Sequence, residues 1–296
     1  MPGPKRIYPV IEALAGQGHS PKKLCRMLEV APSGFYYWRS KPPTIRELRH
    51  EQLRGLIADI HRASMGTYGS RRVAAELRFS YELVANRKAV AAIMRRLGLQ
   101  GLPKRKVRRR GPSSDGAVAS DLVLRQFSVD APNRLWLTDI TEHPTREGKL
   151  YCCVVLDAYS RTVVGWSIDN QQVASLVTSA LGMAISRRKP PAGAILHSDQ
   201  GSQFTSWAFS ERVKTTGLAL SMGRVGDAFD NAMMEAFWAR LQTELLNRKK
   251  WRTRLELANA IFEYLEIFHN RRRRHSALGM LTPAEYESLY VDNLAA

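Results

Sequence analysis

Three carboxylate side chains stand in settings that suit metal-dependent chemistry on a phosphodiester. Asp139 lies within an apolar segment typical of a strand, so its side chain is expected to be buried and must be paired or bind a cation. Asp199 follows a short apolar strand, at the end of a strand where the sites of α/β proteins usually form. Glu235 lies on an expected helix among apolar neighbours. Oxygen ligands without nitrogen or sulfur favour Mg²⁺ or Mn²⁺, and two such ions would activate an attacking oxygen and stabilise a leaving oxygen.

Each carboxylate also has an ordinary structural interpretation. Asp139 could cap a turn, Asp199 could form an Asx turn and Glu235 could be a solvated helix residue. Other kinds of site find no support, because the sequence has no His/Cys cluster with zinc spacing, no Gly-x-x-x-x-Gly-Lys loop and no Gly-x-Ser-x-Gly motif. The placement on a strand, a strand end and a helix therefore favours the metal site.

The elements that would position these carboxylates alternate between strand and helix patterns. A strand is expected over 135–143, and two more strands, both rich in valine and aromatics, are expected over 150–157 and 162–168. A helix over 173–188, a strand over 194–197, a helix over 206–216, an extended segment over 218–222 and a helix over 231–246 follow. This order predicts an α/β fold with a mixed five-stranded sheet, antiparallel at first and then joined by helical crossovers.

The first third of the chain has only helical patterns. Ser20-Pro21 and Ser33 are expected to begin two short helices around a tight turn, which is typical of a helix-turn-helix. A helical period follows from Leu48, and Ser70 is expected to cap a helix over 71–79. A helix over 86–97 would bury its apolar residues and leave four basic residues outside. The sequence therefore predicts two all-α, DNA-binding-like units.

Charge is distributed unevenly along the chain. The net charge is +18, and 24 basic against seven acidic residues lie ahead of Gly111. A positive charge this concentrated favours a polyanion, of which nucleic acid is the usual one, over a mere aid to solubility. Six of the seven residues of 104–110 are basic, and a flexible linker with contacts to backbone phosphates is the simplest interpretation.

The remaining composition restricts the cellular setting. The three cysteines, of which Cys152 and Cys153 are adjacent, predict neither a disulfide framework nor a Cys-x-x-Cys zinc site. No apolar stretch approaches the ~18 residues of a membrane span, and no secretory signal is expected at the N-terminus. The sequence thus predicts a soluble, cytoplasmic protein without a membrane partner.

Several longer motifs resemble one family. The catalytic core of DDE insertion-sequence transposases, in the retroviral-integrase superfamily, is similar to Trp136–Thr141, Leu156–Arg161, His197–Phe204 and Gly226–Glu235. The closer resemblance is to the second-frame (OrfB) product of the two-frame bacterial elements, whose C-terminal signature resembles His269–Gly279 and Thr282–Tyr286. Tyr68–Arg72 resembles that group's upstream helix-turn-helix.

The resemblance implies a ribonuclease H-like fold and a catalytic, metal-binding triad of Asp139, Asp199 and Glu235, which matches the family's aspartate–aspartate–35 residues–glutamate pattern. It also implies Mg²⁺ or Mn²⁺ as cofactor, two ions per site, a circular DNA intermediate and an oligomeric complex on DNA. Asp157 and Asp230 match the motifs too, and we interpret them as a strand-turn residue and a helix N-cap.

One position departs from the family. The Lys or Arg that usually follows the glutamate by seven residues is Gln242 here, and Arg240, Arg248 or Lys249 could replace it. The predicted DNA-binding residues are Arg71, Arg72, Arg87, Lys88, Lys104, Arg105, Lys106, Arg108, Arg109, Arg110 and Gln242.

The expected domains follow from these patterns. They are a helix-turn-helix over 1–43, a second helical DNA-binding domain over 44–102, a basic linker over 103–130, an integrase-like catalytic core over 131–250 and a helical extension over 251–296. The expected function is binding of terminal inverted repeats, cleavage, and joining of the 3′-hydroxyl to target DNA by a nucleoid-associated bacterial homo-oligomer, with a first-frame protein or fusion as a possible partner. A structure-specific nuclease and a DNA-binding regulator with an inactive core remain as alternatives.

Overall fold

The computed structural model describes residues 4–102, 129–222 and 232–295 of the 296. The basic segment 104–110 and Asp230 lie outside the described residues. Two compact units divide the chain, 1–56 and 57–296. In the described ranges, no helix is long and apolar enough to cross a bilayer.

The first unit is a small helical bundle around Ile11, Cys25, Val30 and Phe35. It contains α1 (Pro4–Ala15), α2 (Pro21–Met27) and α3 (Pro32–Ser40), and α4 (Ile45–Ala63) continues from it. Ser20 and Pro21 begin α2 as predicted. The prediction that Ser33 caps α3 was wrong. Ala31 is the N-cap, Pro32 is the first helical residue, and Ser33 lies inside the helix.

Two further helices open the second unit. Helix α5 (Ser70–Tyr81) has Gly69 as its N-cap, so Ser70 lies inside the helix and does not cap it as predicted. In α6 (Arg87–Arg96), the side chain of Asn86 accepts a hydrogen bond from Lys88 N and so satisfies one of the free N–H groups of the first turn. The apolar face of α6 is buried, whereas Arg87 and Lys88 are exposed as the sequence predicts.

A mixed five-stranded sheet forms the centre of this unit. Its strands are β1 (Leu135–Thr145), β2 (Gly148–Asp157), β3 (Val163–Asp169), β4 (Ile195–Ser198) and β5 (Ala219–Met222), in the order β3-β2-β1-β4-β5. The first three strands are antiparallel, while β4 is parallel to β1 and to β5. This topology confirms the predicted sheet.

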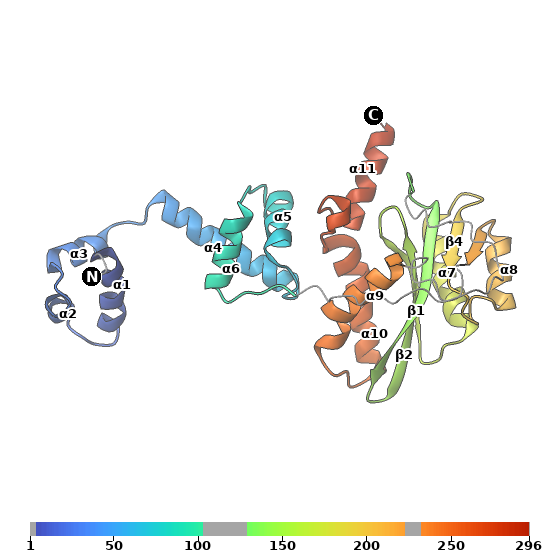
Figure 1. Ribbon diagram of the computed structural model, residues 1–296, viewed down its shortest axis with the longest axis horizontal. Helices are drawn as coiled ribbons and strands as arrows, with labels where there is room; N and C mark the ends of the chain where they lie inside the picture. The colour runs from blue at the N-terminus through green and yellow to red at the C-terminus, as the bar shows by residue number, and fades with distance from the viewer. Residues whose placement is uncertain (1–3, 103–128, 223–231, 296) are drawn as a thin grey trace, which may run out of the picture. The chain divides into compact units, whose positions relative to one another are not determined.

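Helices cover both faces of the sheet (Figure 1). One face carries α7 (Ala174–Arg188) and α8 (Trp207–Thr215). The other carries α9 (Ala232–Glu244), α10 (Arg254–Phe262) and the wider helix η2 (Glu263–Arg272). The short helices η1 (Leu246–Arg248) and η3 (Ser276–Leu278) lead to α11 (Pro283–Ala295). Gly165 lets α7 lie directly on β3, because a Cβ there would be 2.3 Å from the carbonyl oxygen of Ala180.

Candidate active site

The register of the sheet brings two of the predicted carboxylates to the same edge. Strands β1 and β4 are parallel neighbours in which Leu137 pairs with His197. Asp139 follows Leu137 by two residues within β1, and Asp199 follows His197 by two residues, just beyond the end of β4. Because side chains alternate along a strand, the side chain of Asp139 lies on the same face of β1 as that of Leu137. Strand order and register therefore place the two aspartates side by side.

The carboxylate of Asp139 is held in a defined orientation. Its Oδ1 accepts a hydrogen bond from Ile140 N at 2.7 Å, and its Oδ2 accepts one from Trp238 Nε1 at 3.0 Å. Trp238 lies on α9, one turn beyond Glu235. The indole thus fastens α9 to β1 at the level of Asp139, and this brings the first turn of α9, with Glu235, to the site.

The pKa of Asp139 is affected by the charges of both other carboxylates. Burial most of all, together with the negative charges of Asp199 and Glu235, raises its pKa to about 6, against the hydrogen bonds from Ile140 and Trp238. Like charges close to one carboxylate disfavour its ionised form, and a cation between them would relieve that repulsion. The donor set, three carboxylates with no nitrogen or sulfur, suits a hard divalent cation.

The triad is drawn together without forming a closed ligand cage. Asp199 and Glu235 are exposed, and no three acidic, His or Cys side chains in the described ranges converge tightly enough to hold a metal ion. Asp199 Oδ1 accepts a hydrogen bond from Gly201 N at 3.0 Å, which is the Asx turn considered as its ordinary interpretation. That turn engages one carboxylate oxygen and fixes the direction of the other, so it is compatible with metal binding.

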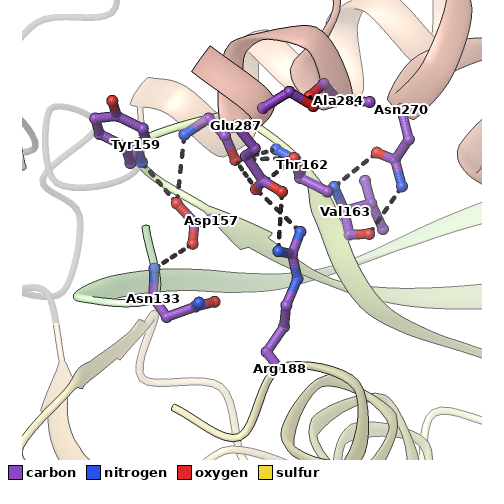
Figure 2. A network of polar contacts seen from close by, with 11 residues as sticks. Asn133, Asp157, Tyr159, Thr162, Val163, Arg188, Asn270, Ala284 and Glu287 are labelled. Atoms are coloured by element: carbon purple, nitrogen blue, oxygen red, sulfur yellow. Dashed lines mark hydrogen bonds and ion pairs between the residues drawn. The ribbon is translucent and has the colours of Figure 1, made fainter. Parts of the chain in front are cut away.

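Asp157 has the structural position expected of it. Its fully buried carboxylate accepts hydrogen bonds from the backbone N–H groups of Asn133, Tyr159 and Ser160 at 2.6, 2.9 and 3.4 Å (Figure 2). Burial, more than the nearby charge of Glu287, raises its pKa. The side chain closes the turn between β2 and β3 and contributes nothing to the cluster at Asp139.

Gln242 is half-buried on α9, two turns beyond Glu235. The three cations that could replace a basic residue there are engaged elsewhere or buried. Arg240 is largely buried, which lowers its pKa to about 10, Arg248 donates to the carbonyl of Met65, and Lys249 pairs with Glu256 at 2.6 Å. A DNA contact at this position stays a prediction for Gln242, with Arg240, Arg248 and Lys249 as the alternatives, of which Arg248 and Lys249 are exposed.

The other predicted DNA-binding residues have different surroundings. Arg71, Arg87 and Lys88 are exposed on α5 and α6. Arg72 is half-buried, 3.7 Å from the carboxylate of Glu244 and over the ring of Tyr68, so a phosphate would have to compete for it. Lys104, Arg105, Lys106, Arg108, Arg109 and Arg110 lie outside the described residues.

Sequence reasoning missed the role of Trp238. It interprets Trp238 as one of several apolar contacts on its helix, and the side chain is indeed buried. The indole N–H is the additional signal, because a buried tryptophan needs a hydrogen-bond acceptor and Asp139 supplies it.

Comparison with known proteins agrees with this geometry. The sequence profile of the Integrase core domain matches residues 129–228, a second Integrase core domain profile matches 216–283, and the HTH-like domain profile matches 48–107. The sheet is accordingly the ribonuclease H-like fold that the resemblance implies.

Curated relatives extend along most of the chain. "Insertion element IS600 uncharacterized 31 kDa protein" of Shigella sonnei is 36% identical over 90% of this chain and 98% of its own length. "Transposase InsF for insertion sequence IS3A" of Escherichia coli is 37% identical over 90% of this chain and 93% of its own. Among solved structures, the HTLV-2 integrase catalytic core domain in complex with magnesium, in its dimeric form, covers 53% of this chain and 97% of its own at 24% identity, with a TM-score of 0.41. Given relatives this similar over nine-tenths of its length, the chain belongs to the insertion-sequence transposases of the retroviral-integrase superfamily.

Proposed function

We propose that this protein cleaves DNA at the ends of its insertion sequence and joins the freed 3′-hydroxyl to target DNA, with Asp139, Asp199 and Glu235 holding the divalent metal. The observation that carries the proposal is geometric: Asp139 and Asp199 each follow the paired residues Leu137 and His197 by two positions, and Trp238 ties α9, which carries Glu235, to Asp139. The raised pKa of Asp139 agrees with this arrangement. Three acidic groups on β1, after β4 and on α9 repel one another without a cation, and such repulsion is typical of functional sites.

The chain's own residues orient this chemistry. Trp238 and Ile140 fix the two oxygens of Asp139, and the Asx turn at Gly201 fixes Asp199. Glu235, on the first turn of α9, completes the set. When bound, Mg²⁺ or Mn²⁺ would supply charge that activates the attacking oxygen and stabilises the leaving oxygen of the phosphodiester. The same carboxylates serve both steps, since hydrolysis and strand transfer differ only in whether water or a 3′-hydroxyl attacks.

DNA is bound, in this proposal, chiefly by the basic N-terminal third. Arg87 and Lys88 are exposed at the start of α6, the second helix of the helix-turn-helix-like segment, where side chains can reach the major groove. Terminal inverted repeats, target DNA, a homo-oligomer and a first-frame protein or fusion are the proposed partners.

Substitution of the triad tests the proposal. In Asp139→Asn, Asp199→Asn and Glu235→Gln the shape of the side chain is kept and the charge that binds the metal is lost, so we expect cleavage in Mg²⁺ to be abolished and DNA binding to remain. The substrate is a labelled duplex copied from the DNA that flanks the gene, and nicking is measured on a sequencing gel. Glu211→Gln, which removes an exposed carboxylate on α8 on the other face of the sheet, is the matched control.

The outcome also separates the alternatives. Wild-type nicking by any one of the three variants would remove that residue from the triad. Nicking without joining of pre-cleaved ends would indicate a structure-specific nuclease, and binding without nicking by the unmodified protein would indicate a regulator.

A further inference from the structure

Two adjacent arginines after η2 are buried although they belong to a run of four. Arg273 is 1% exposed and Arg274 is 2% exposed, whereas Arg271 and Arg272 are exposed. A buried guanidinium is costly unless its N–H groups are paired, so the partners of these two show what the fold needs them for.

Arg274 joins a DNA-binding helix to the C-terminal helix. Its Nε donates to Glu76 Oε2 at 2.7 Å and its Nη2 to Ser80 Oγ at 2.9 Å, both on α5. Its Nη1 donates to Glu285 Oε2 at 2.6 Å, on α11. One guanidinium therefore connects α5 to α11, and Arg274 itself is 198 residues from Glu76 in the sequence.

Tyr68 makes a second connection just before α5. Its buried hydroxyl donates to the carbonyl of Arg272 at 2.9 Å and accepts from Arg274 N at 2.7 Å. Such a doubly bonded hydroxyl fixes both the distance and the direction between two backbone segments. The loop that enters α5 is thus tied to the segment that leaves η2.

Arg273 connects the same region to α9. Its Nε and Nη2 donate to the carboxylate of Glu244 at 2.7 and 2.6 Å, and Tyr264 donates to Glu244 at 2.9 Å. Arg72 of α5 lies 3.7 Å from the same carboxylate. Glu244 is in the last turn of α9 and Glu235 is in its first turn, so this contact links α5 to the helix of the triad.

Helix α11 is fastened to the sheet on its other side. Glu287 accepts hydrogen bonds from Ser160 Oγ at 2.5 Å and Thr162 Oγ1 at 2.9 Å, and it pairs with Arg188 of α7 at 2.9 Å (Figure 2). Glu285 and Glu287 are only two residues apart, yet they bond to different parts of the unit. Helix α11 therefore acts as a brace between α5 and the catalytic sheet.

We propose that these buried contacts, which we call the arginine brace (Tyr68, Glu76, Glu244, Arg273, Arg274 and Glu285), hold the helix-turn-helix-like segment α5–α6 at one fixed position relative to the carboxylates. The position of the bound sequence then determines which phosphodiester reaches Asp139, so the brace residues are positioning residues for cleavage. The positioning role of the brace in cleavage rests on the proposed function. The rigid junction between α5–α6 and the sheet does not depend on that function.

The junction is tested first without DNA. Nitroxide labels are placed on exposed positions of α6 and α8 by Ala89→Cys and Glu211→Cys, because the native cysteines are buried. We expect a narrow distance distribution in the unmodified brace and a broad one in Tyr68→Phe and in Arg274→Met. Glu285→Gln, whose carboxylate is 42% exposed, is the milder variant if Arg274→Met does not fold. Arg271→Met removes one exposed charge from the same run and is the matched control, expected to stay narrow.

Cleavage position is tested second, with the duplex copied from the flanking DNA. In the brace variants we expect nicking at the phosphate used by the unmodified protein to fall about tenfold or more, with products spread over neighbouring phosphates and DNA affinity unchanged. Distances that stay narrow in every brace variant would overturn the brace, whatever the nicking. Distances that broaden while nicks remain at one phosphate would overturn its positioning role. If distances broaden and even the unmodified protein does not nick, the proposed function fails and the brace as a rigid junction stands.

Discussion

At the scale of single residues, Trp238 governs how Asp139 is presented. The indole N–H donates a hydrogen bond to Asp139 from α9, and this bond favours the ionised carboxylate that a metal requires. The same side chain packs edge-on against Phe237 with ring centroids 4.9 Å apart, so its position is fixed by the core. Trp238 therefore packs as a core side chain and also lowers the pKa of Asp139.

Trp238→Phe keeps an aromatic ring and removes this one donor. Because the lost hydrogen bond lowers the pKa of Asp139, we expect that pKa to rise and the acid limb of the cleavage profile to move to higher pH. Since fewer Asp139 side chains are ionised near pH 6 in the variant, we expect the cleavage rate at that pH to fall by roughly tenfold. Rates of nicking in Mg²⁺ across a pH series measure both effects.

Trp207→Phe is the control for this change, since Trp207 is 80% exposed on α8. Its profile should match that of the unmodified protein. An unchanged acid limb in Trp238→Phe would mean that the indole only packs.

At the scale of elements, α9 has two ends with different tasks. Its first turn carries Glu235 of the candidate site and its last turn carries Glu244, about 14 Å further along at the rise of an α-helix. Burial alone would raise the pKa of Glu244, but the Arg273 guanidinium, together with the charge of Arg72 and the hydrogen bond from Tyr264, outweighs burial and leaves that pKa below its ordinary value. The far end of the catalytic helix is thus anchored by a charge pair that must remain ionised.

Glu244→Gln removes that pair and leaves Arg273 buried without its counter-charge. We expect a loss of about 3–5 kcal/mol in the free energy of unfolding at pH 7, measured by urea denaturation. The pH dependence should change too. A carboxyl group whose pKa is lowered by folding stabilises the protein above its ordinary pKa of 4.5, and this contribution is lost as the pH falls through the lowered value.

The unmodified protein should therefore lose more stability than Glu244→Gln between pH 7 and acid conditions below pH 4.5. Glu51→Gln, which breaks the exposed pair with Arg54 on α4, is the control and should change stability little at either pH. Parallel pH curves for the unmodified protein and Glu244→Gln would show that Glu244 is not the acid-sensitive group.

At the scale of the whole molecule, charge and packing divide the chain differently. Most of the positive charge lies ahead of Gly111, but residues 57–102 belong to the same compact unit as the catalytic sheet. Cutting the chain near residue 110 would strip Glu244 and Arg274 of their contacts from α5. The part played by the basic residues in DNA binding is therefore best measured in the full chain.

Replacing the six basic residues of 104–110 by glutamine provides that measurement. Each lost phosphate contact lowers the slope of log affinity against log salt by about 0.9, so we expect a slope reduced by up to about 5. A variant with the order of 104–110 permuted keeps the charge and should keep the slope. Equal slopes in all three proteins would exclude this segment from the DNA contacts.

The sequence predicts the sheet and the three carboxylates because their signals are local. Valine-rich apolar runs indicate β2 and β3, and an aspartate after a short apolar run identifies Asp199. The arginine brace has no such local signal, since Arg271 to Arg274 are four identical residues of which only two are buried. What distinguishes them is contact with Glu244, Glu76 and Glu285, and those contacts exist only once distant segments have packed.

The arginine brace has a consequence for engineering. Consider a chimeric transposase in which residues 57–102 come from a relative with another recognition sequence. The relative's residues would then stand at positions 68, 72 and 76, where Tyr68, Arg72 and Glu76 now contact the rest of the unit. Retargeting by such an exchange should succeed only when α11 and the segment after η2 are transplanted together with the recognition helices. On this view, specificity for DNA ends can be exchanged between transposases only when α5, α6 and α11 are exchanged together.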